Sequence, residues 1–146
     1  HEEHAYAADF RAAAEQARTD GLGLWAPAAC GAPAAALVAV AAVEANPAGP
    51  DEDDLNGEGV LLENRGDATA DLGGWVLRDE SSVNRYAFAS GTLLAPGETL
   101  VVTSGCGDDD ARRRHWCSRG PVWNNGGDTA LLLDPQGNVA SLLAYP

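Results

Sequence analysis

The stretch Pro121-Val-Trp-Asn-Asn-Gly-Gly-Asp-Thr-Ala-Leu-Leu-Leu-Asp134 decides the fold class of this chain. It joins a turn signal to a strand signal, because Asn124 to Gly127 are residue types that tolerate positive φ and Leu131 to Leu133 are typical strand residues. No catalytic motif accompanies the stretch. It predicts that this part of the protein is a β-fold, so the functional question is what such a β-module is attached to.

Composition sets the size and class of the protein. The chain has 146 residues, of which 45% are hydrophobic, enough for one domain of ordinary size with a real core and a further fragment. The Ala- and Val-rich segment from Ala34 to Val43 is too short to cross a bilayer, so we expect no membrane span. The chain begins at His1 without an initiator Met or a signal peptide, and we expect it to be part of a longer protein.

The chain is strongly acidic. Its 22 Asp and Glu residues outnumber 9 basic residues, all of them Arg, and the net charge is -13. Nucleic-acid affinity is built largely on cationic contacts that release counterions from the phosphates. We therefore expect no direct nucleic-acid binding by this module unaided.

The first segment, residues 1–25, reads as a helix with an apolar hook behind it. Tyr6, Phe10 and Ala17 recur at helical spacing, and Gly21 ends the helix. The stripe has too few large side chains to hold an independent fold, at about 25 cal/mol per Å² of buried apolar area. We expect this segment to be the end of an upstream domain, followed by a Pro-punctuated linker at residues 26–36.

The remaining segment, residues 37–146, changes to a strand-like period. Short apolar runs alternate with Gly, Pro, Asn and Asp clusters, with no helical pattern between them. The expected strands are Val38 to Glu44, Val60 to Glu63, Trp75 to Arg78, Tyr86 to Phe88, Thr99 to Thr103, Thr129 to Leu133 and Val139 to Ala144. This spacing predicts a mainly β protein, an immunoglobulin-like antiparallel β-sandwich with an N-terminal α-helix. We expect Trp75 and Trp123 on strands in its core.

A set of motifs in the same order resembles prokaryotic lamin tail domains over residues 36–146. These motifs are Asn46-Pro47, Asp54-Leu-Asn-Gly-Glu58, Leu62-Glu-Asn-Arg-Gly-Asp67, Asp71-Leu-Gly-Gly-Trp-Val-Leu-Arg-Asp79, Leu94-Ala-Pro-Gly97 and Val122-Trp-Asn-Asn-Gly-Gly-Asp128. The resemblance implies an immunoglobulin-like sandwich that is an appended, non-catalytic module for binding or targeting, often beside nucleases or other secreted enzymes.

The opening segment, residues 1–30, resembles the last helix and exit of a staphylococcal-type thermonuclease domain. Tyr6, Phe10 and Gly21-Leu-Gly-Leu-Trp25, with Cys30 after them, carry this resemblance. It implies that the catalytic groups and the calcium-binding carboxylates of such a nuclease lie upstream, so no catalytic residue is assigned in this chain. The resemblance implies no cofactor in this chain and a possible calcium ion in that upstream domain, against which Trp25 would pack.

Cys106 and Cys117 lie at the two ends of a polar, Gly-rich loop that needs a covalent cross-link to hold it in place. A disulfide here would close about ten residues and restrict the unfolded chain by roughly 2–3 kcal/mol. The alternative is a pair of unpaired small core residues. A disulfide would imply an oxidising compartment, and together with the family resemblance it predicts an extracellular, secreted protein. Cys30 is then the odd thiol, with its partner expected upstream.

The acidic run Asp51-Glu-Asp-Asp54, with Asn56 after it, invites a calcium interpretation. Residues 52, 54, 56, 57 and 63 fall at positions 1, 3, 5, 6 and 12 of an EF-hand loop. Position 1 should be Asp, and strand-like runs stand where an EF-hand needs helices, so we reject that motif. Two alternatives stay open, a looser calcium site at Asp51, Asp53, Asp54 and Asn56, or a solvated acidic loop.

Arg112, Arg113 and Arg114 precede His115 and Trp116, and guanidinium groups with an indole are typical of a nucleic-acid patch. Three Asp residues directly precede them and would largely neutralise their field. The alternative is therefore a self-compensated loop. His1-Glu-Glu-His4 has the wrong spacing for a zinc helix, and no Ser/His/Asp arrangement is credible.

Three functional hypotheses follow. The first is a non-catalytic binding or targeting module at the C-terminus of a secreted thermonuclease-like nuclease. Its partners would be the upstream nuclease-like domain and another protein or a cell-surface component. The second is a tail domain that contributes directly to nuclease activity. The third is a stand-alone protein-interaction or cell-surface domain.

Overall fold

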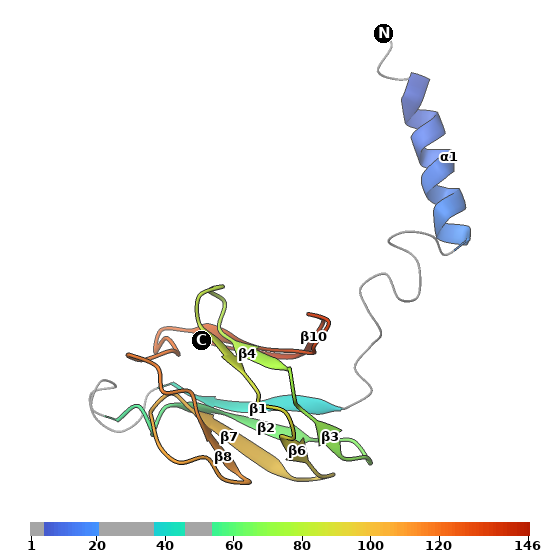
Figure 1. Cartoon of the computed structure of the whole chain (residues 1–146). Helices are drawn as coiled ribbons and strands as arrows, with labels where there is room; N and C mark the ends of the chain where they lie inside the picture. The colour runs from blue at the N-terminus through green and yellow to red at the C-terminus, as the bar shows by residue number, and fades with distance from the viewer. Residues whose placement is uncertain (1–4, 21–36, 46–53) are drawn as a thin grey trace. The chain divides into compact units, whose positions relative to one another are not determined.

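The computed structural model describes residues 5–20, 37–45 and 54–146. The chain divides into two compact units, His1–Pro33 and Ala34–Pro146, and each is described by itself. The first unit contains the helix α1 (Ala5–Thr19), as the apolar spacing predicts (Figure 1). Near its end the Thr19 hydroxyl donates a hydrogen bond to the Glu15 carbonyl over 2.9 Å.

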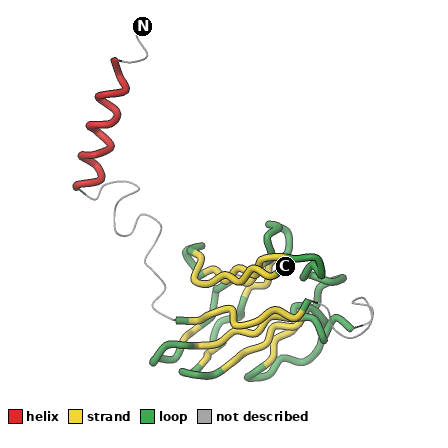
Figure 2. The backbone as a smooth tube through the Cα atoms, turned by 180° about the vertical axis from the view of Figure 1, so that it is seen from behind, coloured by secondary structure: helices red, strands yellow, loops and turns green. Residues whose placement is uncertain are grey.

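The second unit is a β-sandwich built from two four-stranded sheets (Figures 1 and 2). The first sheet has the order β1 (Val38–Glu44), β2 (Gly59–Asn64), β7 (Thr99–Thr103) and β8 (Arg113–His115). The second has the order β10 (Val139–Tyr145), β9 (Asp128–Leu133), β4 (Val76–Arg78) and β5 (Arg85–Ala87). A small third sheet pairs β3 (Ala70–Asp71) with β6 (Leu93–Leu94). The predicted immunoglobulin-like sandwich is confirmed.

Alternate residues of the long strands point into the core between the two sheets. The least exposed of them, at 0–1%, are Val60, Leu62, Leu100 and Val102 from the first sheet and Leu77, Ala130 and Leu132 from the second. Their neighbours in sequence, such as Leu61 and Val101, are half-buried on the outer face of the first sheet. This period of two is the pattern from which the strands were predicted.

Three short strands, β3, β6 and β8, were missed because their two or three residues show no apolar alternation, whereas β4 and β5, also of three residues, belong to the apolar runs that predicted them. One of them also departs from the expected antiparallel arrangement, because β8 pairs with β7 in parallel, Val101 opposite Arg113 and Thr103 opposite His115. Arg113 and Arg114 therefore lie in an edge strand of the first sheet, where the sequence had suggested a loop.

The turn from Asn124 to Gly127 and the strand after it are confirmed. The Gly127 amide donates to the Asn124 carbonyl over 3.1 Å, and Gly127 alone of these four residues has a positive φ, 111°. The two predicted core tryptophans are buried, Trp75 at 5% and Trp123 at 2% exposure. Their placement on strands was wrong, since Trp75 precedes β4 and Trp123 lies in the loop before the turn. Both tryptophans are therefore core residues that lie in loops and not on strands.

Both lateral sides of the sandwich are closed. On one side the Val40 amide of β1 donates to the Ser141 hydroxyl of β10 over 3.0 Å, where both strands have an irregular register. On the other side aromatic rings pack in a row, with centroids 5.0 Å apart for Tyr86 and Phe88, 5.8 Å for Tyr86 and Trp116, and 6.2 Å for Trp116 and Trp123. The edges of the two sheets are thus tied together.

The Cys106–Cys117 disulfide is present and closes the loop that contains β8, over a sequence separation of 11. We expect the double variant Cys106→Ser, Cys117→Ser to lose about 2–3 kcal/mol of unfolding free energy, because the open loop regains entropy in the unfolded chain. Guanidinium unfolding would measure this loss, with Cys30→Ser in both proteins to prevent thiol exchange. Equal midpoints for the two proteins would contradict a stapling role.

Candidate functional site

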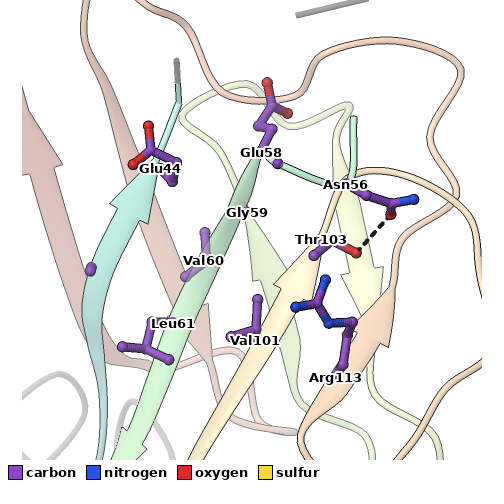
Figure 3. A pocket seen from close by; sticks show the side chains of 11 residues that line it. Glu44, Asn56, Glu58, Gly59, Val60, Leu61, Val101, Thr103 and Arg113 are labelled. Carbon is purple, nitrogen blue, oxygen red and sulfur yellow. Dashed lines mark hydrogen bonds between the residues drawn. The ribbon is translucent and has the colours of Figure 1, made fainter. Parts of the chain in front are cut away.

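A hollow of about 280 Å³ lies on the outer face of the first sheet and is taken as the candidate site. Figure 3 shows the side chains that line it. Its apolar floor comes from the central strands, and two of its charged residues, Glu44 and Arg113, come from the two outer strands, while Glu58 precedes β2. The lining residues used below are Ala42, Glu44, Asn56, Gly59, Leu61, Val101, Thr103 and Arg113.

The floor of the hollow is open because residue 59 has no side chain. Gly59 is in β2 at the position that points to the outer face, as Leu61 does two residues later. A Cβ atom at Gly59 would lie 2.7 Å from the Val102 carbonyl oxygen of β7. Only glycine lets the backbones of β2 and β7 approach this closely here.

Charged and polar groups frame this floor. Glu44 of β1 and Arg113 of β8 stand on opposite sides of it (Figure 3). The Thr103 hydroxyl lies 3.3 Å from the Asn56 Oδ1 atom, and the Asn56 Nδ2 atom donates to the Cys106 carbonyl over 3.2 Å. The disulfide loop therefore orients the polar rim. An apolar floor between opposite charges can bind a segment of a partner.

Glu58 is fully buried beside this hollow and ties three segments together. Its Oε1 atom accepts hydrogen bonds from the Ser104 hydroxyl over 2.5 Å, the Val122 amide over 2.6 Å and the Trp123 amide over 3.2 Å. Glu58 was not predicted from the sequence. One signal was available, because Glu58 continues the alternation of the core residues Val60 and Leu62. This carboxylate holds the loop before β9 onto the first sheet.

Tyr145, at the end of β10, faces the same end of the sandwich and lies opposite Asp128 in β9. Burial is the main cause that raises the pKa of the Tyr145 phenol, and the charges of Asp128, Glu58, Asp79 and Glu80 raise it further. Its hydroxyl has no hydrogen-bond partner among the described residues. The folded state therefore holds the Tyr145 proton more tightly than the unfolded chain does.

This shift predicts a loss of stability at alkaline pH. The contribution of Tyr145 is fully present below the tyrosine pKa of the unfolded chain, about 10, and is lost as pH rises from there towards the higher folded pKa. Between roughly pH 9.5 and 11.5, we expect the unfolding free energy to fall more steeply in the parent than in Tyr145→Phe. Urea unfolding across this range would measure it, and parallel curves would contradict the prediction.

The predicted calcium residues are only partly described. Asp51 and Asp53 lie outside the described residues. The Asp54 Oδ1 atom accepts the Gly57 amide over 3.0 Å, and the Asn56 side chain is engaged at the rim of the hollow. Within the described ranges no three His, Cys, Asp or Glu residues are grouped to bind a metal ion. The calcium site stays a prediction.

Two of the three arginines of the predicted nucleic-acid patch contact a neighbouring carboxylate through their backbone amides. The Asp110 Oδ1 atom accepts the backbone amides of Arg112 over 2.7 Å and Arg113 over 2.8 Å. The Arg112 hydrogen bond, then that of Arg113 and the charges of Arg113 and Arg114, lower the pKa of Asp110. Only Arg113 of the three lines the hollow. Nucleic-acid binding by this group stays untested.

Comparisons with known proteins give one family. The sequence model described as Lamin Tail Domain matches residues 32–146. None of the curated proteins compared with the chain matches it. No helix among the described residues is long and apolar enough to span a bilayer.

Solved structures offer more distant similarities. The archaellum periplasmic stator protein FlaG from Sulfolobus acidocaldarius is 13% identical with a TM-score of 0.42, covering 75% of this chain and 99% of its own. The FlaF and FlaG complex of the same organism contains a chain that is 11% identical, also with a TM-score of 0.42, covering 75% and 88%. Similarity at this level supports no inference about function.

Proposed function

Because the chain belongs to the lamin tail domain family, we propose that this immunoglobulin-like module is a non-catalytic binding module that holds a protein partner on the outer face of its first sheet. One observation supports the choice of face. The hollow there has an apolar floor between Glu44 and Arg113, so it offers a partner both apolar burial and two charges of opposite sign.

A site-specific cross-linking experiment tests this proposal. A photoreactive residue placed at Ala42, which is exposed at the hollow, should cross-link a partner in a cell-surface extract of the source organism. The matched control is Ala144, an exposed alanine on β10 of the second sheet. We expect Arg113→Glu to abolish the Ala42 product. Equal products from Ala42 and Ala144, or a product insensitive to Arg113→Glu, would overturn the proposal.

A finer proposal concerns the parent protein. We infer that the module follows a thermonuclease-like domain, because residues 1–30 resemble the last helix of that family and α1 is present within them. The Cys106–Cys117 disulfide supports an extracellular location for the whole protein. Calcium, if used, would bind in the upstream nuclease-like domain.

The rival hypothesis is that the module takes part in nuclease catalysis. Nuclease activity of the full-length parent with and without residues 36–146 separates the two. An unchanged kcat on free DNA supports the binding-module proposal. A lower kcat after removal would support direct participation and contradict the non-catalytic role.

A further inference from the structure

The outer edge of β8 is covered by its own chain. In the parallel pairing with β7, the Arg112 carbonyl accepts the Val101 amide over 2.9 Å and the Trp116 amide donates to the Thr103 carbonyl over 2.8 Å. The Arg112 carbonyl and the Trp116 amide therefore point towards β7, whereas the Arg112 amide donates to the Asp110 Oδ1 atom over 2.7 Å. The backbone groups of Arg113 and His115 point to the opposite side of β8, where no strand among the described residues pairs with it.

Two aspartates form hydrogen bonds with these outward-facing backbone groups. The Asp110 Oδ1 atom accepts the Arg113 amide over 2.8 Å, and the Asp110 amide donates to the Arg113 carbonyl over 2.9 Å. The Asp109 Oδ1 atom accepts the His115 amide over 2.8 Å. The Arg113 amide, the Arg113 carbonyl and the His115 amide therefore all have hydrogen-bond partners. A neighbouring strand would pair with the same three groups in the same order.

The covering loop is held in place at several points. The Cys106–Cys117 disulfide joins its two ends. The His115 ring, whose side chain is 10% exposed, contacts Asp109 through Nδ1 at 3.1 Å. The same ring packs against Gly107, where a Cβ atom would lie 2.5 Å from the His115 Nε2 atom. These contacts position the Asp109 carboxylate along the strand.

We propose that the outer edge of β8 is a binding edge for an extended acidic segment of a partner protein, and that Asp109 and Asp110 hold it closed as an intramolecular substitute for that segment. Two observations select an acidic partner. Carboxylates already occupy the edge, and Arg112, Arg113 and Arg114 place three positive charges along it. An extended segment binds such an edge through backbone hydrogen bonds. This inference concerns the edge of the sheet and does not depend on the hollow.

Amide hydrogen exchange tests the closed state at single residues. Asp110→Ala should speed exchange of the Arg113 amide, and Asp109→Ala that of the His115 amide, each by about tenfold, because each variant removes one charged acceptor. Asp108→Ala is the matched control, because it lies in the same loop and gives the same change of charge at a residue that does not accept the Arg113 or the His115 amide, and it should leave both rates unchanged. Unchanged rates in the first two variants would overturn the proposal.

Binding of a probe tests the open edge. The probe is a labelled peptide of alternating Asp and Val residues, and its control has Lys in place of Asp. We expect the full chain with Asp109→Ala and Asp110→Ala to bind the acidic peptide at least roughly tenfold more tightly than the parent, by fluorescence anisotropy. Equal affinities, or equal binding of the Lys peptide, would overturn the proposal. If the double variant fails to fold by near-UV circular dichroism, Asp110→Ala alone, assayed with the same peptides, decides the question by the same criterion.

Discussion

Glu58→Ala is expected to lower the unfolding free energy by about 3–4 kcal/mol, with a fall in melting temperature of roughly 10–20 °C. The Glu58 side chain is completely buried, and one of its oxygens accepts hydrogen bonds from the Ser104 hydroxyl and the amides of Val122 and Trp123. Alanine would remove the acceptor and leave three donors buried without a partner. Urea unfolding, followed by tryptophan fluorescence, measures the change.

Two further variants separate the causes. Glu58→Gln keeps an acceptor oxygen in place but removes the charge, so we expect a smaller loss of about 1–2 kcal/mol. Glu63→Ala, in the strand β2 that follows Glu58, is the control, because Glu63 makes only a partly exposed ion pair with Arg65 at 2.8 Å and should contribute less than about 1 kcal/mol. A Glu58→Ala loss no larger than that of Glu63→Ala would contradict the role assigned to Glu58.

The strands of the sandwich could be predicted where local alternation is strong. Val38 to Glu44 and Thr99 to Thr103 have the same ends in the sequence prediction and in the structure. The turn before β9 was equally local, because Gly127 supplies the positive φ that it needs. In these segments the residue pattern and the final environment agree, since each strand has one buried face.

The candidate site could not be predicted in the same way because its contacts join distant parts of the chain. Glu58 and the Val122 amide are separated by 64 residues, and no periodicity in either segment reports their approach. The hollow depends on the order of strands β1, β2, β7 and β8, which places Glu44 and Arg113 on opposite sides of one face. The covered edge of β8 depends on its parallel pairing with β7, which cannot be predicted from the sequence of a three-residue strand.

The two regions share a physical connection. In the disulfide loop, the Cys106 carbonyl accepts a hydrogen bond from the Asn56 side-chain amide at the rim of the hollow, and the same loop places Asp109 and Asp110 at the edge of β8. Arg113 belongs to both, since its side chain lines the hollow and its backbone faces the aspartates. A ligand bound in the hollow or at the edge of β8 would therefore lie next to the same disulfide-bonded loop.

Trp123→Ala is expected to cost about 3–5 kcal/mol of unfolding free energy, because it leaves a large cavity where the loop before β9 packs on the sandwich. Trp123 is 2% exposed, and no larger side chain among the described residues is as completely buried. Its ring packs edge-on against Trp116, with centroids 6.2 Å apart at 84°. We therefore expect the near-UV circular dichroism of the aromatic row to weaken together with the stability, and thermal unfolding measures the latter.

Trp123→Phe shows whether ring volume or the indole N–H provides this stability. The Trp123 Nε1 atom has no hydrogen-bond partner among the described residues, so phenylalanine removes no hydrogen bond there. It keeps an aromatic ring against Trp116 and should cost only about 1–2 kcal/mol. If Trp123→Phe destabilised the protein as much as Trp123→Ala, the indole N–H would be making an essential contact and packing would not explain the effect. The expected order of stability is therefore parent, Trp123→Phe and then Trp123→Ala, because the stabilising contribution of this residue lies in the apolar volume that closes the end of the sandwich.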